Sequence, residues 1–329
     1  MFQKLAAGIR RRKRLSAVFV LCIIVVIGPY PISRFRSAGR RIRVRSIADS
    51  NGPRQTTAQE RSSIRIVSFN IAHGRGDTDD NWKESGHRKH ARIEKIASLI
   101  EETEADIVVL NEVDFDSTWS GHQNQAEAIA KLAEYPFWVE QRNLDFRFAY
   151  GTWKFGNAIL SKFPIVDCRP VEFPAYKPWE RLLAGCKRGA ICTLQVSPNR
   201  RIRVVAVHLE HRNEDVRVKS ARMIEELAGT SEWPLIAVGD FNSTPTGFPR
   251  AEQSTTGKTA FDVLVASNQF QFQPRLKPSA DEMTFLSSDP TQVIDWILIP
   301  PNWEFADYKV IKSTLSDHRP VSATIVFDE

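Results

Sequence analysis

The hydrophobic positions of this chain fall into short runs separated by polar segments, and the spacing within each run predicts its secondary structure. Residues 88–103 and 215–228 place apolar side chains at helical spacing, so we predict a helix over each range. Apolar runs of strand length predict β-strands at residues 64–70, 105–113, 157–165, 188–196, 202–210, 234–240, 293–300 and 319–327. Strands joined both by helices and by short connections predict an α/β domain with large mixed sheets.

A longer apolar run lies near the N-terminus and is flanked by basic residues. Residues 15–33 carry no charged side chain, and they follow a basic segment at residues 1–14. This pattern predicts a transmembrane signal anchor; the alternative is a cleaved signal peptide, although no A-x-A-like site closes the run. Residues 34–61 are rich in Arg, Ser and Gln and predict a basic flexible linker. We therefore expect a single-pass membrane protein whose folded domain, residues 62–329, lies on the extracytoplasmic side.

The charge of the chain is divided unevenly between this N-terminal region and the rest. The whole chain has 45 Lys and Arg residues and 39 Asp and Glu residues, for a net charge of +6. The first 54 residues hold 13 of the basic residues and one acidic residue, which leaves 32 basic and 38 acidic residues, or −6, beyond them. Bulk charge therefore does not support a folded domain that coats nucleic acid, although a local basic groove would not show in such a count.

Several motifs that would indicate other chemistry are absent from the sequence. It has no G-x-S-x-G elbow and no P-loop, which argues against a serine esterase and a nucleotide triphosphatase. Three cysteines lie beyond the apolar run, namely Cys168, Cys186 and Cys192. An odd number cannot pair completely within one chain, and none has metal-type C-x-x-C spacing, so we expect small buried hydrophobic side chains.

Polar residues recur where the predicted strands end. The set consists of Asn70, Glu112, His208, Asp240, Asn242, Asp295, Asp317 and His318. Each residue alone is a common turn or capping residue. Strand ends gather at one rim of a sheet, however, so side chains far apart in sequence can form a single cleft. The repeated pattern therefore predicts one polar site.

The stretches that carry these residues resemble the endonuclease/exonuclease/phosphatase superfamily, which includes deoxyribonuclease I-like and neutral sphingomyelinase-like phosphoesterases. In chain order they read SFNIAHG, DIVVLNEVD, GNAILSKFP, VVAVHLEHR, VGDFNSTP, IDWIL and SDHRPV, over about residues 62–327. GDFN followed by SDH near the end of the chain is the most specific part. The resemblance implies a four-layer α/β sandwich with two facing mixed sheets flanked by helices, and a divalent-metal phosphoesterase site at one edge.

The resemblance also implies roles for the residues. Glu112 would be the primary metal ligand, with Asn70 beside it and Asp317 on the same side. Mg²⁺ is the expected cation, with Mn²⁺ as the alternative, because a hard cation takes few carboxylates and retains water and substrate oxygens. The chain has no His/Cys cluster of zinc spacing, which makes zinc a poor fit.

The remaining residues are expected to move protons or contact the phosphate. Asp240 would orient or deprotonate the attacking water, and alternation would place Asn242 on the same face to contact the phosphate. His318, paired with Asp295, would contact the phosphate or transfer a proton, since a neighbouring carboxylate raises the pKa of a histidine. His208 is expected as a second catalytic histidine, unless it is simply a satisfied strand-end residue. Asn157 is expected to touch substrate, unless it is a turn residue.

The sequence departs from the family pattern in two places and leaves the substrate open. Asn111 stands where the family often has Gln, and residues 114–125 lack the Arg that related proteins commonly carry. The RGD tripeptide at residues 75–77 is short enough to arise by chance, and it lies in the loop after the first predicted strand. We expect a phosphodiesterase acting on a phospholipid or sphingolipid head group or on nucleic acid. The alternative is a non-catalytic binding or scaffold domain that retains the fold.

Overall fold

The structure is a computed structural model that describes residues 16–22, 41–47, 61–148, 151–178, 180 and 188–327. Besides a helical stretch at residues 16–22, its α-helices are α3 (Gly86–Glu102), α4 (Gln125–Leu132), α6 (Glu214–Gly229) and α7 (Ala260–Ala266). Its 3-10 helices are η3 (Ala72–Gly74), η4 (Thr118–Ser120) and η5 (Ala280–Glu282). Its strands are β1 (Ile42–Ser46), β2 (Ser63–Asn70), β3 (Ile107–Asp114), β4 (Phe137–Phe148), β5 (Gly151–Ser161), β6 (Ile165–Glu172), β7 (Arg188–Ser197), β8 (Arg200–His208), β9 (Leu235–Asp240), β10 (Asp295–Leu298), β11 (Glu304–Val310) and β12 (Val321–Val326).

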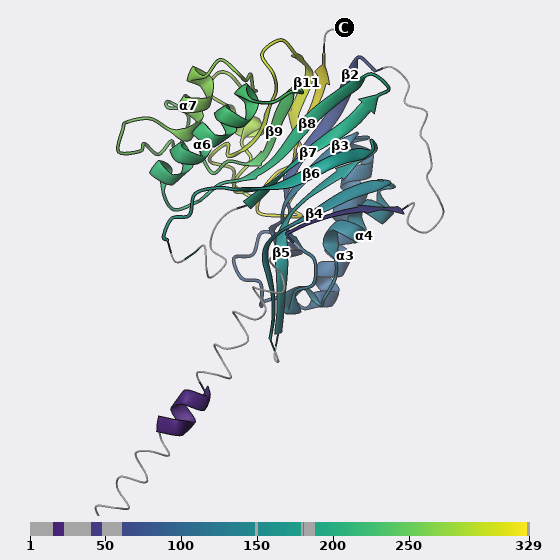
Figure 1. Ribbon diagram of the computed structural model, residues 1–329, viewed down its shortest axis with the longest axis vertical. Helices are drawn as coiled ribbons and strands as arrows, with labels where there is room; N and C mark the ends of the chain where they lie inside the picture. Colours follow the sequence, from purple (N-terminus) through teal and green to yellow (C-terminus); the bar gives the residue numbers. More distant parts are fainter. Residues whose placement is uncertain are drawn as a thin grey trace, which may run out of the picture.

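These strands form two mixed sheets (Figure 1). The larger sheet has the order β1-β4-β5-β3-β2-β12-β11, and the smaller has the order β10-β9-β8-β7-β6. Neighbours are antiparallel except for one parallel pair in each sheet, β2 with β3 and β8 with β9. The carboxyl ends of each parallel pair lie together, which places their terminal residues at one edge of the sheet.

Three hydrophobic clusters separate four layers. Alternate residues of the facing strands, such as Ile66 of β2 and Val238 of β9, form a central cluster between the sheets. The outer face of the larger sheet packs on α3 and α4, where Ile96 is buried, and the outer face of the smaller sheet packs on α6 and α7, where Phe261 is buried. Figure 1 shows the two helix pairs on opposite sides of the sheets. The prediction of two facing mixed sheets flanked by helices is confirmed.

The two predicted helices correspond to α3 and α6. α3 begins after Ser85 and α6 after Asn213, and each of these residues accepts a backbone N–H of the first turn through its side chain. Such caps satisfy donors that have no partner within the helix. Five further elements were not predicted from the sequence, namely α4, α7, β4, β6 and β11.

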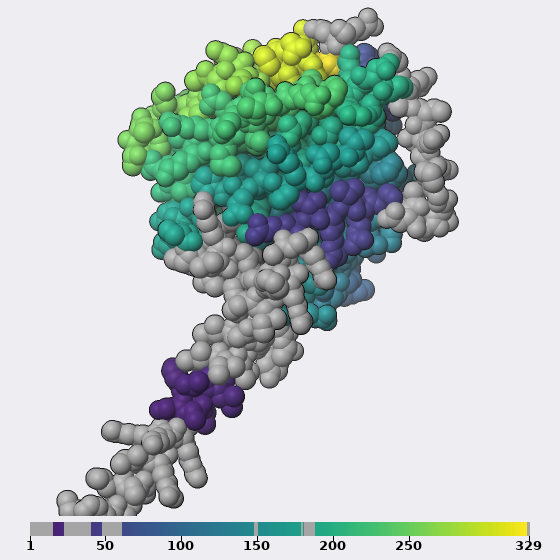
Figure 2. Space-filling model, in the orientation of Figure 1, coloured from purple at the N-terminus to yellow at the C-terminus, as the bar shows by residue number. Residues whose placement is uncertain are grey.

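Residues 42–46 lie inside the segment predicted as a linker, yet they form the edge strand β1. This strand pairs with β4, from Ile42 opposite Gln141 to Ser46 opposite Phe137. Ile42 and Val44 alternate with arginines at the two-residue period of a strand; Ile42 packs against the central cluster, whereas Val44 is exposed. Figure 2 shows β1 as a purple strip on the molecular surface. The larger sheet therefore includes residues that precede the predicted domain boundary at residue 62.

The predicted anchor at residues 15–33 lies largely outside the described residues, as does the basic segment at residues 1–14. Residues 16–22 are described, and they are helical and exposed. Across the described parts of the chain, none of the helices combines the length and the apolar character needed to cross a membrane.

Cys168 of β6 and Cys192 of β7 form a disulfide. The two residues lie directly opposite each other in the strand pair, with their Cα atoms 4.1 Å apart. The expectation of unpaired hydrophobic side chains was therefore wrong for these two cysteines. Three cysteines leave room for one pair, and the third, Cys186, lies outside the described residues.

Candidate active site

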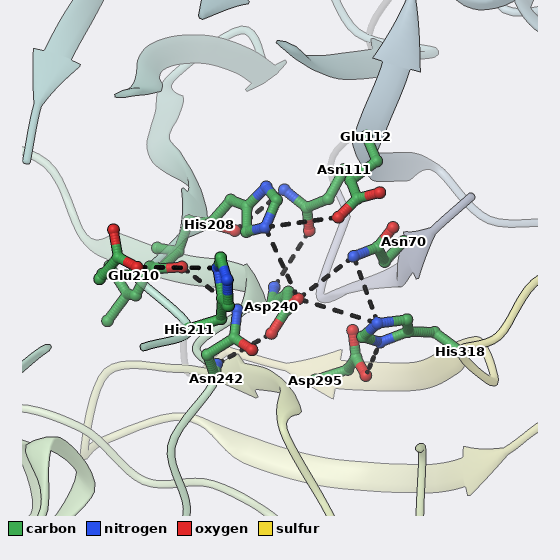
Figure 3. A network of polar contacts seen from close by, with 12 residues as sticks. Asn70, Asn111, Glu112, His208, Glu210, His211, Asp240, Asn242, Asp295 and His318 are labelled. Atoms are coloured by element: carbon green, nitrogen blue, oxygen red, sulfur yellow. Dashed lines mark hydrogen bonds and ion pairs between the residues drawn. The ribbon is translucent and has the colours of Figure 1, made fainter. Parts of the chain in front are cut away.

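Three strand ends of the smaller sheet place a histidine and two aspartates side by side. His208 of β8 lies opposite Asp240 of β9, and Asp240 lies opposite Asp295 of β10. The residues two positions along each strand belong to the central cluster: Ala206, Val238 and Ile297. Because side chains alternate along a strand, the three polar side chains point into the same space between the sheets. Figure 3 shows them together there.

The end of the larger sheet supplies the opposite side of the site. Asn70 of β2 lies directly opposite Asn111 of β3. β3 then carries a bulge in which Asn111 and Glu112 together face Asn157 of β5. Glu112 has a φ of 53°, which is uncommon for a residue other than glycine. Consecutive residues of a regular strand point to opposite faces, and the bulge is what directs both Asn111 and Glu112 to the site.

Asn111 connects the two sheets. Its side-chain oxygen accepts the backbone N–H of Asp240 at 3.0 Å, and its nitrogen donates to the carbonyl of Val207 at 3.0 Å. The same nitrogen donates to the side-chain oxygen of Asn157 at 2.8 Å. The difference from the family pattern at this position therefore affects a residue that fixes Asp240 from the opposite sheet.

Asn157 is completely buried, and both ends of its amide are engaged within the protein. Its oxygen accepts from Asn111, and its nitrogen donates to the side-chain oxygen of Gln141 at 2.6 Å and to the carbonyl of Arg188 at 2.7 Å. Asn157 therefore contacts Asn111, which in turn contacts Asp240. The contact with substrate predicted for it stays a prediction.

The carboxylate of Asp240 is held by two asparagines. Nδ2 of Asn70 donates to its Oδ2 at 3.2 Å, and the backbone N–H of Asn242 donates to its Oδ1 at 2.8 Å. Asn242 has a φ of 50° and lies beyond the end of β9, so the alternation expected for residues 240 and 242 does not extend to it. The side chain of Asn242 donates to the carbonyl of Leu209 at 3.2 Å.

The orientation of Asn70 bears on its predicted role as a metal ligand. Its side-chain oxygen accepts the backbone N–H of Ala72 at 3.1 Å, so its nitrogen faces the site and donates to Asp240. An amide nitrogen is a donor and not a cation ligand. Asn70 thus orients Asp240 in this arrangement, and its role at a metal stays a prediction.

His318 forms a buried pair with Asp295. Its Nδ1 donates to Oδ2 of Asp295 at 2.8 Å, and the side chain of Asp295 is 0% exposed. Burial alone would lower the pKa of His318, but Asp295 and the nearby carboxylates of Asp240 and Asp317 outweigh it and raise the pKa to about 10. The imidazole is therefore protonated at neutral pH, and its Nε2 lies 3.9 Å from Oδ2 of Asp240.

His208 completes the group from the smaller sheet. Its Nε2 lies 3.8 Å from Oε1 of Glu112 and 3.8 Å from Oδ2 of Asp240. The histidine therefore stands between a carboxylate of each sheet. This position agrees with the polar site predicted from the strand ends.

Two further residues reach the site from the loop after β2, and neither was given a role from the sequence. Arg75 donates through Nη1 to Oε2 of Glu112 at 3.2 Å and through Nη2 to Oδ2 of Asp317 at 2.6 Å. His73 lies with its Nε2 3.4 Å from the same oxygen of Glu112. The RGD tripeptide that we set aside as a chance match contains this arginine. Proximity to Asn70 in sequence was the signal that could have found both residues.

Carboxylates outnumber cations in the site. Glu112, Asp240, Asp295 and Asp317 supply four acidic groups, whereas Arg75 and protonated His318 supply two positive charges. Burial raises the pKa of Asp317, although His318 and Arg75 oppose this shift. The excess of negative charge on oxygen ligands fits a hard divalent cation.

Two positions in the site could hold such a cation. Among the described residues, Asp240, Asp295 and His318 present ligand atoms within 4.8 Å of one another. Those three side chains are almost inaccessible, and His318 already donates to Asp295, whereas the side chain of Glu112 is 25% exposed. Mg²⁺ usually keeps water and binds substrate oxygens, which requires an open position. Glu112 is the carboxylate that meets this requirement.

The sequence matches the model of the Endonuclease/Exonuclease/phosphatase family over residues 67–318. The chain belongs to this family. The resemblance proposed from its motifs is thereby confirmed. Members of the family are phosphoesterases, and they generally use divalent metal ions. A search of curated protein sequences finds no match to this chain.

Solved structures share the fold at low sequence identity. An endonuclease/exonuclease/phosphatase from Beutenbergia cavernae matches with a TM-score of 0.60 and 18% identity, over 81% of this chain and 72% of its own. A mannosyl-6-phosphatase from Bacteroides thetaiotaomicron matches with a TM-score of 0.57 and 16% identity, over 80% and 100%. The human Nocturnin catalytic domain, with a bound sulfate anion, matches with a TM-score of 0.56 and 14% identity, over 88% and 98%. At these identities the likeness concerns the fold alone.

Proposed function

We propose that this chain hydrolyses phosphoric esters, phosphodiesters in particular, by in-line attack of water with a divalent cation at Glu112. The proposal rests on one observation. Strand ends of the two sheets bring more carboxylates than cations together around the His318–Asp295 pair. A phosphodiester is anionic and repels an attacking hydroxide. Hydrolysis therefore needs charge neutralisation, an oriented nucleophile and a proton for the leaving group.

Glu112 would be the principal ligand of the cation, with Asp317 on the same side. We propose Mg²⁺, with Mn²⁺ as the alternative. When bound, the cation neutralises phosphate oxygens and polarises the phosphorus–oxygen bond. The excess of carboxylates and the exposed fraction of Glu112 support this assignment.

Asp240 is the residue that we assign to orienting the attacking water and taking its proton. The backbone of Asp240 is held by Asn111, and its carboxylate is held by Asn70 and Asn242, as described above. A general base held in this way needs no reorientation when the substrate binds. Asn242 would meet a phosphate oxygen from the turn that follows.

The two histidines would act on the phosphate side. His318 is cationic, and Asp295 holds its ring, so its Nε2 can donate to a phosphate oxygen or to the leaving group. His208 faces the same space from β8, and we assign it to the phosphate as well. Asp295 acts through His318, since it is buried behind the ring.

Hydrolysis of bis(p-nitrophenyl) phosphate tests the proposal. The full chain in detergent is assayed with EDTA and then with added Mg²⁺ or Mn²⁺, beside Glu112→Gln and Asp240→Asn, with the exposed Asp307→Asn as the matched control. We expect metal-restored turnover that falls at least about a hundredfold in the two site variants and is unchanged in the control. If neither this diester nor a p-nitrophenyl monoester is hydrolysed, the non-catalytic scaffold domain becomes the better description.

Two substrate classes suit a phosphodiesterase of this kind: a lipid head group and nucleic acid. Sphingomyelin or phosphatidylcholine vesicles and single- and double-stranded DNA are the test substrates, with mannose 6-phosphate as a monoester arm suggested by the fold neighbour named above. Affinity for nucleic acid should fall steeply with salt, because each phosphate contact releases counterions. A lipid substrate should not show that dependence.

We propose further that residues 15–33 anchor the chain and that the folded domain lies on the extracytoplasmic side. The uncharged apolar run supports the anchor, and the Cys168–Cys192 disulfide suits an oxidising compartment. Cell fractionation tests the anchor, and an impermeant protease applied to intact cells tests the side. Recovery of the chain in the soluble fraction, or full protection of the folded domain, would contradict these two proposals respectively.

A further inference from the structure

The loop after β2 holds one oxygen of the Glu112 carboxylate. Nη1 of Arg75 donates to Oε2, and Nε2 of His73 lies 3.4 Å from the same atom, whereas Oε1 faces His208. We propose that His73 and Arg75 are positioning residues that hold Oε2, so that Glu112 presents Oε1 to the cation. This inference rests on the proposed function, in which Glu112 is the metal ligand.

The ring of His73 is fixed on its far side by Asp114. Nδ1 of His73 donates to Oδ1 of Asp114 at 2.9 Å, and Nε1 of Trp119 donates to Oδ2 of Asp114 at 2.8 Å. Asp114 is fully buried, and the rings of Trp119 and Phe155 pack edge-on against His73, at 5.7 and 5.3 Å between centroids. The imidazole therefore stands between two carboxylates and cannot rotate without losing both contacts. Such outer contacts commonly orient a metal ligand.

A buried glutamine fixes the backbones of the same two residues. Nε2 of Gln125 donates to the carbonyl of His73 at 2.9 Å, and its Oε1 accepts the N–H of Asp114 at 2.8 Å. Gln125 is 0% exposed and begins α4. The separation of His73 from Asp114 is therefore set by a third element that packs on the larger sheet.

The backbone conformation of His73 and Glu112 also supports a positioning role for His73. His73 has a φ of 55°, and Glu112 has a φ of 53°. Left-handed conformations are uncommon for residues other than glycine and cluster at functional sites when the surrounding structure holds them. Both residues of the contact at Oε2 adopt this conformation: His73, which lies in η3, and Glu112, which lies in the bulge of β3.

Arg75 adds charge neutralisation to this arrangement. Its guanidinium donates both to Glu112 and to Asp317, so it joins two carboxylates that would otherwise repel each other. The planar fork of an arginine suits two such contacts. Because Oε2 is already paired with this cation, a metal ion is directed to the other oxygen.

Two substitutions of His73 separate positioning of Glu112 from a structural role. Asparagine places its amide nitrogen near the position of Nδ1 and can keep the contact with Asp114. Glutamine, which is one methylene longer, places its nitrogen near Nε2 and can keep the contact with Glu112. Mn²⁺ affinity is measured by calorimetry on the full chain, and thermal melting is measured in EDTA.

We expect the two measurements to rank the variants in opposite order. His73→Asn should weaken Mn²⁺ binding by about tenfold, and His73→Gln by no more than about threefold. His73→Asn should nevertheless melt at the higher temperature, since asparagine adopts a positive φ more readily. Asp114→Asn should weaken Mn²⁺ binding as His73→Asn does, because it loosens the ring.

The outcomes distinguish this inference from the proposed function. Equal Mn²⁺ affinities for the wild type and both His73 variants, with binding abolished in Glu112→Gln, would overturn the positioning role and leave the metal site intact. Weaker binding in His73→Gln than in His73→Asn would also overturn it, since the contact with Asp114 would then be the one that matters. Mn²⁺ binding that Glu112→Gln does not change would contradict the proposed function itself.

Discussion

The side-chain oxygen of Asn111 accepts the backbone N–H of Asp240 at 3.0 Å, so a residue of the larger sheet fixes a strand end of the smaller one. The nitrogen of the same side chain spans the gap to the carbonyl of Val207. Asn111 is fully buried, so water does not reach these groups to replace it. At the site the sheets are thus joined by hydrogen bonds in addition to the apolar packing of the central cluster.

Replacing Asn111 with alanine should destabilise the protein and impair the site together. The change removes the partners of a buried N–H and two buried oxygens, and each unsatisfied buried group costs about 1–3 kcal/mol. We expect a loss of about 3 kcal/mol in the free energy of unfolding by urea, together with lower turnover. Asn111→Gln, the residue common in the family, keeps the amide and should lose less in both measurements. An alanine variant as stable as the wild type would refute this account.

Gly239→Ala should be far more damaging than alanine at an unconfined glycine. Gly239 has a φ of +139°, and an added Cβ would lie 2.0 Å from the carbonyl oxygen of Val207 and 2.9 Å from Oδ1 of Asn111. Both neighbours belong to the contact between the sheets, so we expect a loss of about 3 kcal/mol or more. Gly247→Ala is the control, because nothing lies within 4 Å there and only its φ of +92° is unfavourable. Similar unfolding free energies for the two variants would show that close approach at Gly239 is unimportant.

The pairing of His318 with Asp295 should make the metal-free protein less stable at alkaline pH. The pKa of His318 rises from 6.5 to about 10 on folding, so its contribution is fully present below pH 6.5 and is lost as the pH rises through 10. Asp295→Asn removes the strongest partner of the imidazolium and should reduce this loss. Unfolding free energies in EDTA are compared for both proteins between pH 6.5 and 10. Parallel curves would contradict the assignment.

The disulfide between β6 and β7 should contribute measurably to stability. Cys168 and Cys192 are separated by 24 residues, and closing a loop of that size stabilises the folded state by about 3 kcal/mol. The double variant Cys168→Ser and Cys192→Ala should therefore unfold at lower urea concentration than the wild type. The exposed Cys22→Ser is the control and should leave the midpoint unchanged. If a thiol reagent labels Cys168 and Cys192 in the unreduced, denatured chain, the bond is not formed.

A bound cation should stabilise the folded protein through Glu112. Mn²⁺ at about one hundred times its dissociation constant should add about 2.7 kcal/mol to the free energy of unfolding. Glu112→Gln should abolish most of this gain, whereas Asp307→Asn should retain it. Thermal melting with and without EDTA measures the difference. A gain that persists in Glu112→Gln would place the cation elsewhere, with Asp240, Asp295 and His318 as the next candidates.

The sequence pattern by itself predicted an α/β domain with large mixed sheets and a polar site at the strand ends, and the family resemblance added the four layers. Alternating or continuous apolar runs identify strands, and helical spacing identifies α3 and α6, because both periods are local properties of the chain. The same periods explain why Asn70, His208 and Asp240 could be proposed together. His208 and Asp240 each end a strand whose inward-facing positions are apolar, so the direction of each side chain follows from the residues before it.

Tertiary structure decided what local periodicity cannot express. The bulge that turns Glu112 into the site depends on how β3 pairs with β5, and alternation alone would have placed this residue on the opposite face. His73 and Arg75 look like ordinary loop residues until the fold brings them to Oε2 of Glu112. The Cys168–Cys192 bond likewise exists because β6 and β7 are in register. Register and contacts between sheets join residues distant in sequence, and local preference contains no information about them.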